Sequence, residues 1–102
     1  MPGSSARVST TAASRYGKQL AEHLSRHSTP QWDGTDGLIV MPFGTCALSA
    51  EVDALVLRVE AADEAALSRV EEVAGSHLER FGRRNELSVT WIRDSEADHA
   101  DV

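Results

Sequence analysis

An apolar stripe between Asp63 and Arg84 constrains the fold of this chain more than any other feature. The stripe consists of five residues at spacings of three, four, four and three: Leu67, Val70, Ala74, Leu78 and Phe81. These spacings follow the period of an α-helix, so the five side chains lie on one helix face. Asp63 is a suitable N-cap, and Glu64 suits the positive end of the helix dipole. The sequence therefore predicts a helix from Asp63 to about Arg84 that buries one face against a sheet.

A second helix is predicted over Ala12–His27. Its apolar face is made by residues spaced four apart, which are Tyr16, Leu20 and Leu24. Pro30 follows this helix, and the residue before a proline is disfavoured in the α region. The segment Ser28–Gly37 is rich in turn residues, so we expect a loop whose Trp32 covers one edge of the core.

Four segments have the apolar run or the alternation that is typical of β-strands. They are Leu38–Phe43, Cys46–Glu51, Leu55–Glu60 and Leu87–Ile92. Short turns join the first three segments, which predicts an antiparallel meander. The last strand starts close to the end of the Asp63–Arg84 helix, so it must run parallel to the third strand through a crossover. We expect it to lie beside the first strand.

The elements follow one another in the order α-β-β-β-α-β. They predict an α+β fold in which a four-stranded, mainly antiparallel sheet carries two helices packed on one face. The expected core combines apolar side chains from both layers, which are Leu48, Leu57, Val59, Leu67, Val70, Leu78, Phe81 and Trp91.

Residues 12–93 are expected to form a single α+β domain. Residues 1–11 are rich in Ser, Thr, Gly and Pro and predict a flexible N-terminal arm. Residues 94–102 predict an acidic disordered tail, because they hold four acids and no apolar stripe. Removal of residues 1–8 and 95–102 is therefore expected to leave the melting temperature nearly unchanged.

Charge and composition exclude several classes of protein. The net charge is −6, and the chain has no basic patch of the kind that binds nucleic acid. It has neither the roughly 18-residue apolar run of a membrane helix nor the apolar region of a signal peptide. Cys46 is the single cysteine and cannot form an internal disulfide. We expect a cytoplasmic protein, monomeric or homodimeric, that is stabilised by packing alone.

Three stretches of the sequence are similar to a known bacterial family. They are the helix residues Arg15-Tyr16, Leu20 and His23-Leu24, the turn Phe43-Gly44-Thr45-Cys46, and the run from His77 to Glu86 followed by Trp91. Together they resemble the domain of unknown function 2218 over residues 8–93. The resemblance implies no established activity and assigns no catalytic residue. It does imply a partner, because relatives are sometimes fused to, or encoded near, flavin-dependent siderophore-interacting reductases.

Three histidines are candidate metal ligands. His23 and His27 are neighbours on one helix face, and His77 borders the apolar stripe of the other helix. If the helices lie side by side, the three imidazoles converge and can hold zinc or iron with an open position. The alternative is structural: His77 donates a hydrogen bond to a backbone carbonyl, and the other two histidines are partly exposed.

Three arginines are candidate ligands for an anion. Arg80, Arg83 and Arg84 lie at the end of the predicted Asp63–Arg84 helix, and guanidinium groups suit a phosphate or a siderophore carboxylate. The alternative is that they stabilise the negative end of the helix dipole and pair with Glu79 and Glu86.

Cys46 offers a similar choice between a reactive thiol and a small buried apolar residue. It shares a strand face with Leu48 and Ala50, which favours the buried residue. No set of catalytic residues is apparent, so the chain is not expected to be an enzyme.

Three hypotheses of function remain. The first is a binding or accessory domain associated with siderophore-iron utilisation. The second is a histidine-based metal-binding protein or enzyme. The third is a structural homodimer through the free sheet face, which Val56, Thr90 and Ile92 favour and Arg58 and Glu60 oppose.

Overall fold

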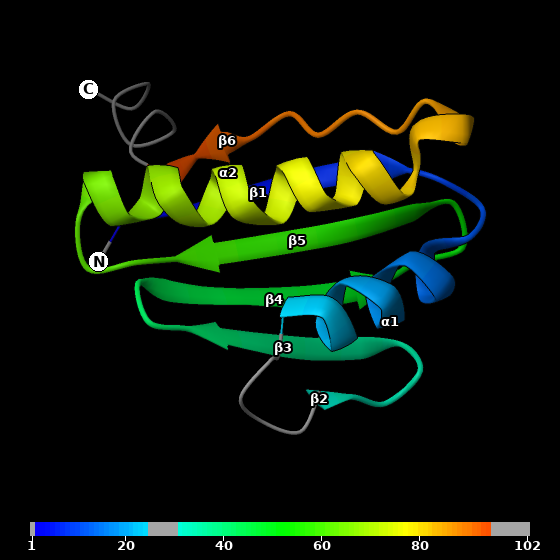
Figure 1. Ribbon diagram of the computed structural model, residues 1–102, viewed down its shortest axis with the longest axis horizontal. Coiled ribbons are helices and arrows are strands. Elements are labelled where there is room, and N and C mark those ends of the chain that lie inside the picture. The colour runs from blue at the N-terminus through cyan, green and yellow to red at the C-terminus, as the bar shows by residue number, and fades with distance from the viewer. Residues whose placement is uncertain (1, 25–30, 95–102) are drawn as a thin grey trace.

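The computed structural model describes residues 2–24 and 31–94 (Figure 1). Helix α1 spans Ala13–Leu24 and helix α2 spans Glu64–Phe81, followed by a short 3-10 helix, η1, over Arg83–Asn85. Six strands complete the described part, which are β1 Gly3–Ser9, β2 Gln31–Trp32, β3 Asp36–Met41, β4 Gly44–Ala50, β5 Ala54–Glu60 and β6 Ile92–Arg93.

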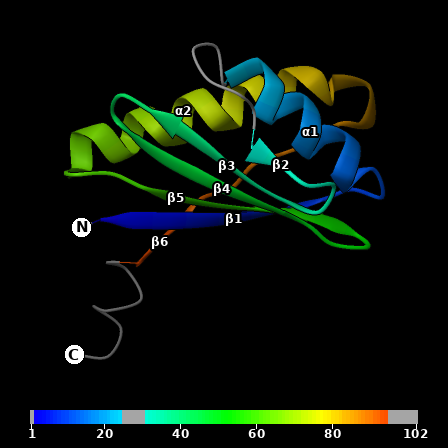
Figure 2. The ribbon, with the colours of Figure 1, turned by 90° about the horizontal axis from the view of Figure 1, so that it is seen from below.

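The six strands form one antiparallel sheet in the order β2-β3-β4-β5-β1-β6. Both helices cover the same face of this sheet, and no helix of residues 2–24 and 31–94 lies on the opposite face (Figure 2). α1 lies over β3, β4 and β5, while α2 lies over β4 and β5 and also contacts α1. The α+β class and the two helices on one face are confirmed. The predicted number of strands, four, is wrong.

The middle of the sheet agrees with the predicted meander. β3, β4 and β5 correspond to the predicted strands over Leu38–Phe43, Cys46–Glu51 and Leu55–Glu60, with ends shifted by one or two residues. The expected loop over Ser28–Gly37 contains β2 and the start of β3 instead, as far as it lies within the described residues. β2 was missed because it is only two residues long and has no alternation to detect.

Helix α2 begins as predicted and ends earlier. The Asp63 side chain accepts a hydrogen bond from the Ala66 amide at 2.8 Å, so Asp63 is the N-cap. The helix ends at Phe81, because the Gly82 amide donates to the Leu78 carbonyl and the chain then tightens into η1. The arginines beyond Phe81 therefore lie in η1 rather than in the α-helix.

The N-terminal segment is a strand in the interior of the sheet, so the prediction of a flexible arm is wrong for Gly3–Ser9. β1 pairs with β5 along its whole length, from Gly3 opposite Glu60 to Ser9 opposite Ala54. Its inward residues Ser4, Ala6 and Val8 are all buried. The alternation is present in the sequence, but serine and alanine at two of the three inward positions give it little apolar contrast.

The last strand is shorter than predicted and lies elsewhere. Residues 87–91 run irregularly beside α2, and only Ile92 and Arg93 pair, with Ser5 and Ser4 of β1. β6 is therefore parallel to β5 as predicted, with β1 between them, but it does not lie beside β3. The reason is that β1 takes the place next to β5 and offers its other edge to the returning chain.

The core is contiguous and matches most of the predicted set. Six of the eight predicted residues are buried, and Phe81 and Trp91 are only partly buried against the others. The prediction missed four large residues that are also fully buried, which are Val8, Leu20, Ile39 and Leu55. Trp32 packs against this core, as expected of a residue that covers its edge.

A polar network under α2 joins β1, β6 and the helix. The buried Ser4 hydroxyl donates to Glu71 Oε2 at 2.7 Å, and Arg93 donates to Glu71 Oε1 at 2.8 Å. Burial by itself raises the pKa of Glu71, but the hydrogen bonds from Arg93 and Ser4 and the charge of Arg93 outweigh it and lower that pKa. The carboxylate therefore stays ionised and ties the helix to both strands.

We expect deletion of residues 2–9 to unfold the domain or to lower its melting temperature by many degrees. The deletion removes three inward side chains, exposes one edge of β5 and leaves β6 without the strand with which it pairs. Thermal melting followed by circular dichroism measures the effect. Arg7→Ser is the control, because this exposed side chain forms only surface ion pairs, worth about 0–1 kcal/mol. A truncated chain that melts within a few degrees of the full chain would contradict the interior position of β1.

Candidate functional site

A pocket lies where the start of α1 meets the end of α2. The two helices run in opposite directions, which brings these two ends to the same end of the molecule (Figure 1). The pocket has a volume of about 440 Å³ and is lined by Arg15, Tyr16, Arg80, Phe81, Arg83 and Arg84. The three arginines predicted as anion ligands therefore come together, and a fourth joins them from the other helix.

The four arginines of this pocket differ from other arginines of the chain. Arg7, Arg58 and Arg93 each form ion pairs with carboxylates. Within residues 2–24 and 31–94, no ion pair involves the arginines of the pocket. The expected partner Glu79 instead accepts a hydrogen bond from the Val89 amide at 2.9 Å. In the described chain, no carboxylate thus forms an ion pair with the arginines of the pocket.

The helix dipoles explain only part of this cluster. Arg80, Arg83 and Arg84 lie at the negative end of α2, where cations are stabilising. Arg15 lies in the first turn of α1, which contains no acidic residue and is the positive end of that helix. A cation there is unfavourable for the helix and also approaches the other arginines. An anion in the pocket would offset both the repulsion among the arginines and the unfavourable interaction of Arg15 with the α1 dipole.

Two aromatic residues complete the lining. Tyr16 is 4% exposed and belongs to the core, so it fixes the wall of the pocket from α1. Phe81 is partly buried and packs against the same core from α2. Sequence analysis named neither Arg15 nor these aromatic rings as site residues, because nothing local indicates which turns of two helices will meet. One feature of the sequence points to Arg15, which is a basic residue in a first helical turn that has no acidic residue.

Two of the three predicted histidines come together. The rings of His23 and His77 have centroids 4.8 Å apart, and His77 Nδ1 donates a hydrogen bond to the Val73 carbonyl at 2.7 Å. This bond agrees with the structural alternative for His77. His27 lies outside the described residues. In the part of the chain that the structure describes, no group of three possible metal ligands is found.

Cys46 lies in the core on β4 and is fully buried. Burial raises the pKa of its thiol to about 12. The thiolate is the reactive form of cysteine, so this residue packs as a small apolar side chain.

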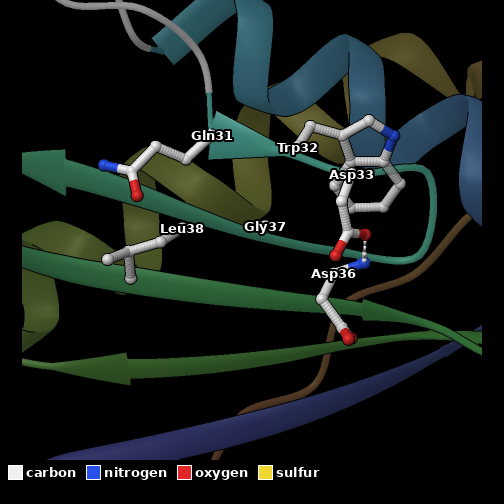
Figure 3. A pocket seen from close by; sticks show the side chains of 6 residues that line it. All are labelled: Gln31, Trp32, Asp33, Asp36, Gly37 and Leu38. Carbon is white, nitrogen blue, oxygen red and sulfur yellow. Dashed lines mark hydrogen bonds between the residues drawn. The ribbon is translucent and has the colours of Figure 1, made fainter.

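A second, more open pocket of about 400 Å³ lies at the β2–β3 edge of the sheet (Figure 3). Here Asp33 Oδ1 accepts hydrogen bonds from the backbone amides of Asp36 and Thr35, which lower the pKa of Asp33. Trp32 covers Gly17 of α1, where an added Cβ would lie 2.5 Å from the indole ring. Both side chains are thus engaged in closing the turn and docking it on α1.

The free face of the sheet bears on the homodimer hypothesis. Ile92 is 63% exposed there and pairs with Ser5, on the same face as the half-buried Val56. Arg58 lies on this face as well and forms an ion pair with Asp94. Thr90 precedes β6 and does not belong to the sheet.

We expect His77→Gln to lower the free energy of unfolding by about 1 kcal/mol, because it removes the ring contacts with His23 and Phe81. Urea denaturation measures this loss.

The purified wild-type protein should hold no stoichiometric zinc, and a chelator should leave its melting temperature unchanged. About one zinc per chain, lost in His77→Gln, would instead establish the metal site.

None of the helices in the described residues is long and apolar enough to cross a membrane.

Comparisons with known proteins place the chain in a family. The family described as "Uncharacterized protein conserved in bacteria (DUF2218)" matches residues 5–92. The NMR structure of PA4090 from Pseudomonas aeruginosa is similar at a TM-score of 0.74 and 26% sequence identity, over 90% of this chain and 96% of that chain. No curated protein matches the chain. The family match covers most of the chain, including most of β1, and confirms the resemblance found in the sequence. The chain therefore belongs to the bacterial family of uncharacterised proteins known as domain of unknown function 2218.

Proposed function

We propose that this domain is a binding module that holds a small organic anion in the arginine pocket between α1 and α2. The observation that carries the proposal is the position of Arg15. It lies at the positive end of its own helix, facing three further arginines across the same pocket. The α2 dipole gives a reason for the other three arginines but none for Arg15.

The chemistry of the pocket suits an anion. Guanidinium groups donate paired hydrogen bonds in a planar fork that matches carboxylate and phosphate oxygens. Charge-assisted hydrogen bonds of this kind are stronger than neutral ones. The pocket volume of about 440 Å³ lies within the range of small-molecule sites, which is roughly 300–1,000 Å³.

The lining residues support binding rather than a reaction. The four arginines can hold an anion and neutralise its charge, and a buried tyrosine and a phenylalanine complete the wall of the pocket. An accessory role follows from the proposal, in which the domain presents or sequesters an anion for another protein. A siderophore-interacting reductase is the partner that we propose, with a siderophore carboxylate as the anion, and the expectation rests on the family resemblance.

Substitution of the arginines tests the proposal. Binding of citrate and of inorganic phosphate is measured by calorimetry at constant ionic strength, because salt screens these interactions. We expect Arg15→Gln and Arg84→Gln each to weaken binding about tenfold or more, the usual effect of losing a hydrogen bond to a charged group.

Arg69→Gln is the matched control. Arg69 is an arginine of α2 whose guanidinium stacks on Phe43, 4.9 Å from the ring centroid, and it does not line the pocket. We expect this variant to bind as the wild type does. Failure of both anions to bind, or an equal loss in Arg69→Gln, would contradict the proposed function.

A further inference from the structure

The arginine pocket continues into a row of aromatic rings between the two helices. Phe81 lines the pocket and also contacts His23 of α1, with ring centroids 5.3 Å apart and planes at 82°. His77 lies beyond, with its centroid 6.4 Å from that of Phe81 and 4.8 Å from that of His23. Phe81 therefore belongs both to the arginine pocket and to a cluster of three mutually packed rings.

These rings are held in place rather than free to collapse into the pocket. His77 is fixed by its hydrogen bond to the Val73 carbonyl, and Phe81 is packed against the core. Phe81 is nevertheless only partly buried, so part of its ring surface stays accessible beside the arginines. A ligand whose charge is held by the arginines can lay an apolar body against that ring.

We infer that the ligand of this pocket is an anion with a planar aromatic body, an arene carboxylate or an aryl phosphate; the inference rests on the proposed function. A bare anion such as acetate or phosphate satisfies the guanidinium groups but gains nothing from Phe81. When an aromatic anion binds, its own ring and the ring of Phe81 both lose contact with water. The two rings also gain the offset or edge-to-face contact that aromatic pairs prefer. Guanidinium planes also stack on aromatic faces. The arginines that line the pocket beside Phe81 can therefore contact both the charged group and the ring of such a ligand.

The test uses two pairs of probes in which a phenyl group replaces the methyl group of acetate or one hydrogen of inorganic phosphate. Acetate is compared with benzoate, and inorganic phosphate with phenyl phosphate, by calorimetry on the full chain at constant ionic strength. We expect each phenyl-bearing probe to bind about fivefold or more tightly than its partner, as an aromatic contact of ordinary strength gives. Within the phenyl-bearing pair, the tighter probe identifies the head group, carboxylate or phosphate.

Three variants test whether the additional affinity for the phenyl-bearing probes arises in this pocket. Phe81→Leu should bring the benzoate-to-acetate affinity ratio close to one, whereas Phe43→Leu, which changes a phenylalanine that does not line the pocket, should leave the ratio as in the wild type. Arg84→Gln should weaken benzoate binding. Benzoate binding that is unaffected by Arg84→Gln would place the bound benzoate outside this pocket and overturn the inference.

The outcomes for the inference and for the proposed function are distinct. If all four probes bind but the phenyl ring gives no gain, the inference is overturned and the proposed anion site stands. If none of the four probes binds, both are overturned.

Discussion

The pairing of β1 with β5 is the interaction on which the rest of this structure depends. It runs along the whole of both strands and buries Val8 and Ala6 beneath the helices. β1 is also the only strand of the described sheet that pairs with β6, through Ile92 and Arg93. Through Ser4 and Arg93, both strands then hold Glu71 of α2. The position of α2, and with it the end of α2 that lines the arginine pocket, follows from a segment that looks unstructured in the sequence.

The pocket places positive charge where the fold alone gives no reason for it. The chain is acidic overall, with a net charge of −6, yet four arginines converge at one end of the helix layer. Like charges that line one pocket repel one another, and Arg15 is unfavourable for α1 as well. A feature that costs stability and lies in a pocket of ligand size is more informative about function than one that stabilises the fold. The arginine pocket differs in this respect from the turn at Asp33, where the carboxylate accepts hydrogen bonds from the amides of Thr35 and Asp36.

Features that depend on a pattern within one helix or strand were predictable from the sequence, whereas features that depend on contacts between distant segments were not. The start of α2 and both ends of β5 were predicted to within one residue, because their apolar positions repeat at periods that belong to one element. β1 was missed because serine and alanine fill two of its three inward positions, and Ser4 is acceptable there only through its bond to Glu71, a contact 67 residues away. The position of β6 could not be predicted without β1. For the site, the cluster at Arg80, Arg83 and Arg84 was visible as a run, whereas Arg15 joins it only through helix packing.

The most direct test of the central claim is to locate the bound anion on the molecule. Amide chemical shifts of the ¹⁵N-labelled protein are followed while benzoate is added at constant ionic strength. The account predicts saturable shifts concentrated at Arg15, Tyr16 and residues 80–84, with little change at Arg7 and Arg58 on the opposite face of the sheet. Saturable shifts centred on that opposite face, or none at the helix ends, would contradict it.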